Sequence, residues 1–277
     1  MKVKDLIIEG NKKVHKDQTK LILSTLLNLN YLELQLHLDD VVELDIIDKF
    51  NNCINNIKEG KPLQYALNNV NFYGLDFYVD ERVLIPRFET EELVYNVNDY
   101  IKKYFKDNIK VLDLGCGTGC IGLTLKHLNK NIDLTLSDLS PYALEVCNIN
   151  KNNFFIDAKI IESDLFENID NKFDVIVSNP PYISIDDEIA DIVKNNEPSM
   201  ALFASNDGLE FYERILKSCE NYLNYKYLIA FEIGANEKDK VLELINKYLK
   251  DVKVITKTDM SGRDRMVFIF KNIEINE

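Results

Sequence analysis

Residues 111–122 read VLDLGCGTGCIG, a short apolar run that leads directly into a row of glycines. The apolar run predicts a buried strand, and glycines let the backbone turn sharply and approach a ligand because they carry no Cβ. The spacing Gly117-x-Gly119-x-x-Gly122 also matches a dinucleotide-binding pattern, which is weak evidence by itself. This stretch predicts a strand, a glycine-rich turn and a helix at the start of an α/β sheet.

The residues around this turn alternate between strand and helix patterns. We expect strands at 110–114, 133–137, 159–162, 173–178, 227–233, 252–256 and 266–270. Helices are expected at 91–105, 119–128, 141–152, 208–223 and 236–250, the third with Ser140 as its N-cap. Such alternation predicts a mostly parallel sheet covered by helices on both faces.

The residues before this region have a different pattern. Residues 1–68 carry leucines and isoleucines at helical spacing and contain no strong strand run, which predicts a small helical domain. Residues 69–85 are rich in aromatics and valine around a turn at Gly74-Leu75-Asp76, which predicts a β-hairpin linker. The α/β domain is expected over 86–277.

Composition narrows the function classes. The chain has 46 acidic against 33 basic residues, a net charge of −13, which disfavours stable nucleic-acid binding and suits a basic protein partner. Five cysteines without a CxxC pair and only three histidines predict reduced thiols and no metal site. With no apolar run near the roughly 20 residues of a membrane span and no signal-peptide pattern, we expect no membrane partner and a cytoplasmic location.

Two aspartates close the strands around the glycine turn. Asp138 ends the second strand, 19 residues after Gly119, where a carboxylate accepts both hydroxyl protons of a ribose. Its alternative role is to cap the next helix beside Ser140. Asp113 either contributes to the ligand site or simply orders the glycine loop, and the sequence leaves both roles open.

After the strand 173–178 the chain continues as Asn179-Pro180-Pro181-Tyr182 (NPPY), at the same sheet edge. A planar amide or amino nitrogen is a poor nucleophile, so an enzyme that methylates it must hold both N–H groups in line with the methyl donor. The Asn179 side-chain oxygen and the Pro180 carbonyl are two such acceptors, and the prolines fix their backbone angles. Tyr182 is expected to stack on the planar substrate group. The alternative is a rigid strand terminator without chemistry.

The pattern D-x-G-x-G-x-G from Asp113 and the NPPY tetrapeptide resemble class I S-adenosylmethionine-dependent methyltransferases that act on planar nitrogens. Further stretches are similar to one branch, the release factor glutamine-N5 methyltransferases of the HemK/PrmC type. They are GKPLQY at 60–65, FYG at 72–74, VLIPRFETE at 83–91, EP at 197–198, AL at 201–202, DGL at 207–209, EIG at 232–234 and DMSGR at 259–263.

This resemblance implies a Rossmann-like methyltransferase sheet, mostly parallel with an antiparallel last strand, and an N-terminal helical domain that binds the substrate. It implies S-adenosylmethionine as cofactor, with S-adenosylhomocysteine as product, and the glutamine of a release factor's Gly-Gly-Gln loop as substrate. It places the catalytic and substrate contacts at Asn179, Pro180, Pro181 and Tyr182. Cofactor contacts would come from Gly115, Cys116, Gly117, Thr118, Gly119, Asp138, Asp164, Leu165 and Asn179, with Arg87 and Glu89 as pocket walls.

The sequence departs from the family pattern at Asn68, Phe88, Leu165 and Glu237, which affects loop geometry and the adenine contacts. The main alternative is a DNA adenine-N6 methyltransferase, which shares NPPY and flips a base onto it. Acidic charge and the lack of an evident target-recognition domain disfavour it. An NAD-dependent oxidoreductase or a binding module leaves NPPY unexplained.

Overall fold

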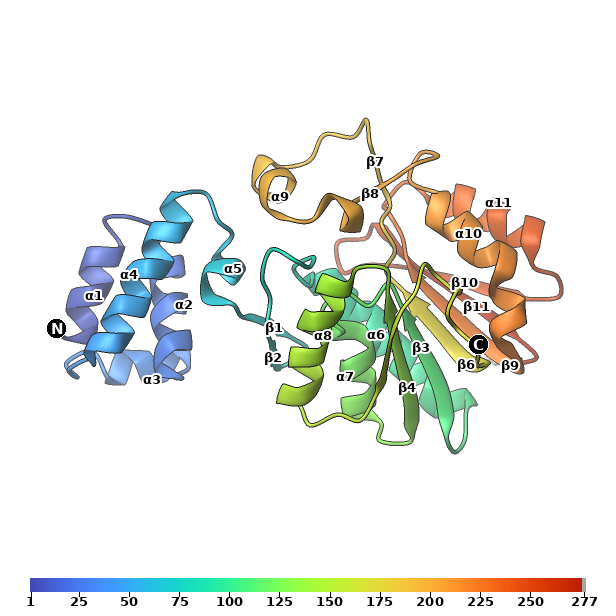
Figure 1. Ribbon diagram of the computed structural model, residues 1–277, viewed down its shortest axis with the longest axis horizontal. Helices are drawn as coiled ribbons and strands as arrows, with labels where there is room; N and C mark the ends of the chain where they lie inside the picture. Colours follow the sequence, from blue (N-terminus) through green and yellow to red (C-terminus); the bar gives the residue numbers. More distant parts are fainter. Residues whose placement is uncertain (276–277) are drawn as a thin grey trace. The chain divides into compact units, whose positions relative to one another are not determined.

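The computed structural model describes residues 1–275, which divide into two compact units. One unit comprises residues 1–69 together with 190–196, and the other comprises 70–189 and the residues from 197 onward (Figure 1). The predicted ranges 1–68, 69–85 and 86–277 did not separate the segment 190–196 from its surroundings. Residues 276 and 277 of the last range lie outside the described residues.

The first unit is helical. Its core contains Leu6, Ile22, Leu34, Phe50 and Ile54, all at most 1% exposed. A Cβ added at Gly10 would lie 2.5 Å from the Thr19 side chain and 2.9 Å from Phe50, so the glycine permits close helix packing. The helices are α1 (Val3–Gly10), α2 (Lys16–Leu27), α3 (Tyr31–Leu36), α4 (Leu44–Lys58), α5 (Leu63–Leu67) and the distant segment α9 (Asp191–Asn196).

The second unit is built on a seven-stranded sheet of order β10-β11-β9-β6-β3-β4-β5 (Figure 1). Neighbouring strands are parallel from β9 to β5, and β11 is antiparallel to both β9 and β10. The predicted sheet, mostly parallel with an antiparallel last strand, is confirmed. The strands are β3 (Ile109–Leu114), β4 (Ile132–Asp138), β5 (Lys159–Glu162), β6 (Phe173–Ser178), β9 (Leu223–Glu232), β10 (Lys253–Thr258) and β11 (Asp264–Lys271).

Helices cover both faces of this sheet. Alternate residues of β3 show why: Val111 packs in a cluster with residues of α6, α7 and α8, whereas Leu112 and Leu114 pack with α10 and α11. The helices are α6 (Phe88–Tyr104), α7 (Cys120–Leu128), α8 (Pro141–Asn153), α10 (Glu210–Ser218) and α11 (Lys238–Tyr248). The parallel strands therefore end at one edge, which carries the glycine turn and NPPY.

Two local predictions need correction, and one short sheet was not predicted. The hairpin β1 (Val70–Phe72) and β2 (Leu75–Phe77) turns at Tyr73 and Gly74, which both have positive φ, one residue earlier than expected. The helix expected over 208–223 ends at Ser218 and continues as a 3₁₀ turn over Cys219–Tyr222. A short sheet of β7 (Ile183–Ser184) and β8 (Phe203–Ala204) after NPPY was not predicted.

The five cysteines are free thiols. Within residues 1–275, no helix is both long and apolar enough to cross a membrane. The same residues contain no group of three or more His, Cys, Asp or Glu side chains arranged to hold a metal ion.

Candidate active site

A cavity of about 290 Å³ lies at the carboxyl edge of the parallel strands of the second unit. That volume is close to the lower end of the range for small-molecule sites, roughly 300 Å³. Eleven of the predicted site residues line it: Arg87, Gly115, Cys116, Gly117, Thr118, Asp138, Asp164, Leu165, Asn179, Pro180 and Pro181. Three predicted residues, Glu89, Gly119 and Tyr182, are not among its lining residues.

The glycine turn presents open space to this cavity. Gly115 and Gly117 have φ of +72° and +52°, and no atom lies within 4 Å of a Cβ built at either position. The N–H groups of Gly115 and Cys116 both donate to the Ser137 carbonyl, at 2.8 and 2.9 Å, which fixes the turn against β4. These two glycines therefore leave a cradle for a ligand, and a side chain at either position would occupy part of that space.

The next two glycines serve packing. A Cβ at Gly119 would lie 2.9 Å from the Cys147 Sγ, and one at Gly122 would lie 2.6 Å from the Leu136 Cδ2. Both contacts are too short for real atoms, so these glycines let α7 pack closely against its neighbours. The dinucleotide-like spacing thus includes positions required by packing.

Asp113 is fully buried at the end of β3. Its Oδ2 accepts the Gly122 N–H at 2.8 Å, while its Oδ1 has no hydrogen-bond partner among the described residues. Burial raises the pKa of the Asp113 carboxyl to about 7, the Gly122 hydrogen bond lowers it, and the nearby Asp138 charge raises it further. Of the two roles left open by the sequence, the contact observed is the one that orders the glycine loop and α7.

Asp138 lines the cavity at the end of β4. Its two carboxyl oxygens accept the Gly117 and Ser140 N–H groups, at 2.8 and 2.9 Å. Burial raises the pKa of Asp138, and these hydrogen bonds oppose the shift. The side-chain cap of α8 is Ser140, whose hydroxyl accepts the Ala143 N–H at 3.2 Å. Each Asp138 oxygen keeps lone pairs for a ligand.

Asp164 and Leu165 line the cavity after β5. The Asp164 carboxylate pairs with the Arg214 guanidinium of α10 at 2.7 Å, a partner that the sequence did not indicate. Leu165 has a φ of +50° and packs partly against the cluster that contains α10 and α11.

NPPY follows β6, whose end is held by a hydrogen bond from the Ser178 hydroxyl to the Leu114 carbonyl at 2.6 Å. The Asn179 Nδ2 lies 3.4 Å from the Thr90 Oγ1, to which it donates. Tyr182 packs against the same α10 and α11 cluster, and its hydroxyl accepts from the Arg265 Nη1 at 3.4 Å. Burial raises the pKa of Tyr182 to about 12. In this arrangement Asn179 and the two prolines line the cavity, whereas Tyr182 is not among the lining residues.

The segment before α6 forms another wall. The Glu197 carboxylate, with a side chain only 2% exposed, pairs with Arg87 at 2.6 Å and accepts the Ile85 N–H at 3.1 Å. Glu89 is exposed and does not line the cavity, whereas Thr90, one residue later, does. Sequence reasoning named Arg87 but missed its buried partner.

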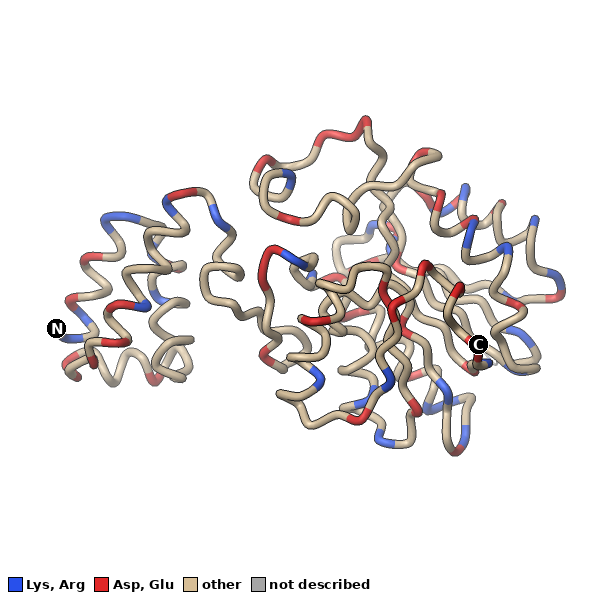
Figure 2. Tube along the Cα trace, in the orientation of Figure 1, with Lys and Arg blue, Asp and Glu red and all other residues tan. Residues whose placement is uncertain are grey.

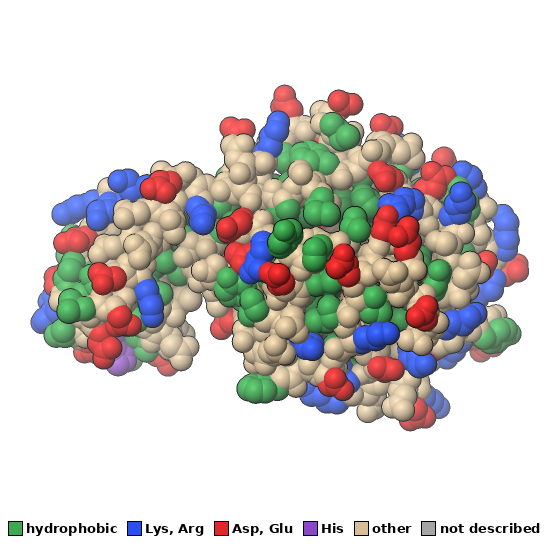
Figure 3. All heavy atoms as spheres, in the orientation of Figure 1, with side chains coloured by type: hydrophobic (Ala, Val, Ile, Leu, Met, Phe, Trp, Pro, Cys, Tyr) green, Lys and Arg blue, Asp and Glu red, His purple; other side chains and the backbone are tan. Residues whose placement is uncertain are grey.

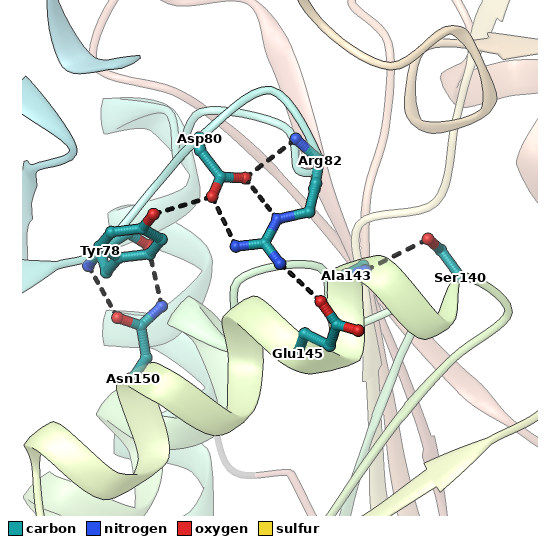
Figure 4. Close-up of polar contacts among 7 residues, drawn as sticks. All are labelled: Tyr78, Asp80, Arg82, Ser140, Ala143, Glu145 and Asn150. Atoms are coloured by element: carbon teal, nitrogen blue, oxygen red, sulfur yellow. Dashed lines mark hydrogen bonds and ion pairs between the residues drawn. The ribbon is translucent and has the colours of Figure 1, made fainter. Parts of the chain in front are cut away.

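The start of this segment is anchored on α8 (Figure 4). The Asn150 side-chain amide accepts from the Tyr78 N–H at 2.7 Å, and it donates to the carbonyls of Tyr78 and Thr118, both at 3.0 Å. Figure 4 also shows the Arg82 guanidinium between Asp80 and Glu145. Its Nη2 donates to the Asp80 Oδ2 and its Nη1 to the Glu145 Oε2, both at 2.6 Å. Asn150 therefore joins one cavity wall to the glycine turn.

Beneath Asn179 lies a buried carboxylate that the sequence did not single out as functional. Thr90 donates its hydroxyl to the Glu232 Oε2 at 2.6 Å, and Glu232, at the end of β9, is 1% exposed. Burial raises the pKa of Glu232 to about 7, whereas the Thr90 hydrogen bond, the Arg265 charge and a hydrogen bond from the Asn179 side chain oppose this shift.

This sheet order, with an antiparallel β11 and a glycine-rich turn after the central strand, defines a class I methyltransferase fold. Residues 97–197 match the family model described as the Methyltransferase small domain. The fold is similar to a crystal structure of a methyltransferase from Pyrococcus furiosus, with a TM-score of 0.53 and 18% identity. That match covers 72% of this chain and 90% of the other.

Sequence relatives narrow the class further. A release factor glutamine methyltransferase of Clostridium botulinum is 37% identical, with 96% of this chain and 98% of the relative aligned. Those of Bacillus anthracis and Streptococcus pneumoniae are 35% and 41% identical, over 90% and 76% of this chain and 90% and 75% of the relatives. The chain belongs to the release factor glutamine methyltransferase family, and the resemblance found in its motifs is confirmed.

Proposed function

We propose that the protein transfers a methyl group from S-adenosylmethionine to the side-chain amide nitrogen of the glutamine in the Gly-Gly-Gln loop of peptide chain release factors. Family membership supports the reaction class. The structural observation that carries the proposal is the position of Asn179 and Pro180, which line one cavity together with the glycine turn. This arrangement puts two hydrogen-bond acceptors beside a cradle for a nucleoside-containing cofactor.

The cavity residues fit S-adenosylmethionine. Gly115 and Gly117 leave open space where the ligand would lie, and Asp138 offers carboxylate lone pairs to a ribose. Asp164 and Leu165 would hold the adenine, with the Asp164 carboxylate shared between the adenine amino group and Arg214. The cofactor, when bound, supplies an electrophilic methyl group.

The chain's own residues would hold the glutamine amide. One N–H donates to the Asn179 Oδ1 and the other to the Pro180 carbonyl, and the ring constraint of Pro180 and Pro181 keeps these acceptors in place. Positive charge develops on the nitrogen during transfer, and fixed acceptor dipoles stabilise it without reorganising. The surplus proton leaves to water. Tyr182 was expected to stack on the substrate, but it packs against the α10 and α11 cluster, and in this proposal it holds the tetrapeptide in place.

Charge favours a protein substrate over DNA. The loop after NPPY carries Asp186, Asp187 and Glu188, adjacent acidic residues in a chain of net charge −13 (Figure 2). Acidic side chains near the site repel phosphates and attract basic protein surfaces. We further propose that the helical residues 1–68 contribute to binding the release factor.

The test uses radiolabelled S-adenosylmethionine with a purified release factor and, in parallel, duplex DNA. We expect label on the release factor only, mapped by mass spectrometry to the loop glutamine. A factor with that glutamine replaced by alanine should stay unlabelled. Label on DNA and none on the factor would overturn the proposal in favour of an adenine-N6 methyltransferase.

A further inference from the structure

We infer that Thr90 and Glu232 are positioning residues that orient the Asn179 side chain so that its oxygen, and not its nitrogen, faces the substrate. This inference rests on the proposed function, because it concerns the same amide-binding site. It assigns a role to a buried chain of hydrogen bonds that joins the first turn of α6, the end of β9 and the residue after β6.

The chain has three members from distant parts of the sequence. Thr90, in the first turn of α6, is 2% exposed, and its hydroxyl donates to the Glu232 Oε2 at 2.6 Å. The Asn179 Nδ2 donates to the same hydroxyl oxygen at 3.4 Å, and the Asn179 amide also acts on Glu232 directly as a hydrogen-bond donor. Thr90 and Asn179 also line the cavity.

The direction of this chain follows from donor and acceptor counts. A threonine hydroxyl has one proton, and the Glu232 carboxyl group, once it is ionised above its pKa of about 7, only accepts. Because the Thr90 proton is used by Glu232, the Thr90 oxygen offers only lone pairs to Asn179. Asn179 must therefore present its NH₂ group to Thr90, which leaves its Oδ1 free for the cavity.

The opposite orientation of the Asn179 amide would be unfavourable for two reasons. It would place the Asn179 Oδ1 against the Thr90 oxygen, two acceptors without a proton between them, and it would direct an NH₂ group at the substrate. A primary amide that must be methylated needs an acceptor for each N–H, so this orientation would oppose binding. The Glu232–Thr90–Asn179 chain thus makes the site selective for an NH₂-bearing planar group.

Charge strengthens the same effect. Hydrogen bonds in a row polarise one another, so a carboxylate at one end makes the Asn179 oxygen at the other a better acceptor. A buried carboxylate is costly unless paired, and the Arg265 guanidinium of β11, bonded to the Ile233 carbonyl at 3.1 Å, lies close enough to compensate Glu232 in part.

A purely structural role is the alternative, since the Thr90–Glu232 bond also fastens α6 to the sheet. The experiment separates the two roles with Thr90→Val, which keeps the shape but removes the hydroxyl, and Thr90→Ser, which restores it. Thr124→Val is the matched control, because Thr124 is equally buried and its hydroxyl has no hydrogen-bond partner within residues 1–275. Turnover is counted per S-adenosylmethionine-binding site, so unfolded protein does not contribute.

We expect Thr90→Val to lower kcat by about 10- to 100-fold, less than the roughly 100- to 1,000-fold loss typical of removing a transition-state contact outright. Cofactor affinity should change by less than about threefold, and Thr90→Ser should recover most of kcat. In an Asn179→Ala background, Thr90→Val should cost nothing further, because it acts through Asn179.

Additive losses in that double-mutant cycle, or a Thr90→Val enzyme with wild-type kcat, would overturn the inference. So would a failure of both Thr90→Val and Thr90→Ala to give cofactor-binding protein, since Thr90 would then be needed for the fold itself. The proposed function is judged separately by the wild-type enzyme. If that enzyme methylates another planar amine and not the release factor, the function fails, and the Thr90 comparison is made on the new substrate.

Discussion

At the scale of single residues, Asn179 is the side chain on which the proposed methyl transfer should most depend. Asn179→Ala removes an acceptor aimed at the nitrogen where charge develops, so kcat should fall by about 100- to 1,000-fold. S-adenosylmethionine affinity should stay within about tenfold, because the glycine turn and Asp138 remain. Single-turnover transfer and equilibrium cofactor binding check this, with the exposed Asn71→Ala on the hairpin as control. Survival of transfer would show that Asn179 is not the acceptor.

Glu232 also makes stability depend on pH. Burial holds its pKa near 7 in the folded protein against 4.5 for the free group, so the folded state keeps its proton while the unfolded chain loses it. The stability gained from the neutral acid is complete below pH 4.5 and is lost as the pH rises through 7. The loss amounts to about 3 kcal/mol for a shift of this size.

Glu232→Gln cannot ionise and should escape that loss. Relative to wild type, its free energy of unfolding should improve between pH 5 and pH 8 by up to about 3 kcal/mol, measured by urea unfolding. The groups that act on Glu232 are Thr90 and Glu89 from α6, Asn179 after β6 and Arg265 from β11, and they are unchanged. Burial also raises the pKa values of Asp113 and Glu237 to about 7. Both groups titrate in the wild type and in the variant, so their contributions cancel in the difference between the two free energies of unfolding. An equal difference at both pH values would contradict this account.

At the scale of elements, the turn between β3 and α7 has glycines of two kinds. Gly117→Ala should fold with a modest cost of about 1 kcal/mol for a positive φ, yet weaken S-adenosylmethionine binding by more than about tenfold. Gly122→Ala should instead lower the free energy of unfolding by about 1–3 kcal/mol, because its Cβ would overlap Leu136 and Asp113. Urea unfolding and cofactor titration of both variants measure the contrast. If Gly117→Ala destabilises more than Gly122→Ala, the division between cradle and packing glycines is wrong.

The sequence predicted those elements whose pattern is local and missed those set by distant partners. β5 and β6 have the predicted bounds because short apolar runs with turn residues on either side determine them. The sequence predicts a helix up to residue 223 and a linker over 224–226. In the structure Leu223 pairs with Phe173 of β6, so β9 already begins at Leu223. The two-residue strands β7 and β8 are too short for any periodicity to indicate.

The same distinction applies to the site. The glycine turn and NPPY are contiguous motifs, so their meeting at one cavity could be predicted from the order of strands. The partners that orient them are 89 to 142 residues apart along the chain, as with Asn179, Thr90 and Glu232. No local pattern specifies such a pair, because it depends on how α6 packs on the sheet.

At the scale of the whole molecule, the chain passes from one compact unit to the other more than once. Residues 190–196 belong to the helical unit, where the Asn196 Nδ2 donates to the Gly60 carbonyl at 3.1 Å. They are flanked by Ile189 and Glu197 of the methyltransferase unit, and Glu197 is the buried partner of Arg87. The segment that follows NPPY is thus shared by the unit that holds the cavity and the unit proposed to bind the substrate.

The surface of that helical unit carries exposed hydrophobic side chains (Figure 3). Leu32 and Leu36 lie one helical turn apart on α3 and are 76% and 84% exposed, so replacing both with serine should leave stability nearly unchanged. If residues 1–68 bind the release factor through such apolar contacts, the double variant should raise the KM for the intact factor by about tenfold or more. The kcat and the S-adenosylmethionine affinity should stay the same, because both are determined in the methyltransferase unit.

Phe155→Ser, at a 95% exposed position of that second unit, is the matched control and should leave the KM unaltered. An unchanged KM in the Leu32 and Leu36 variant, with wild-type folding, would show that α3 does not contact the substrate and that recognition lies elsewhere.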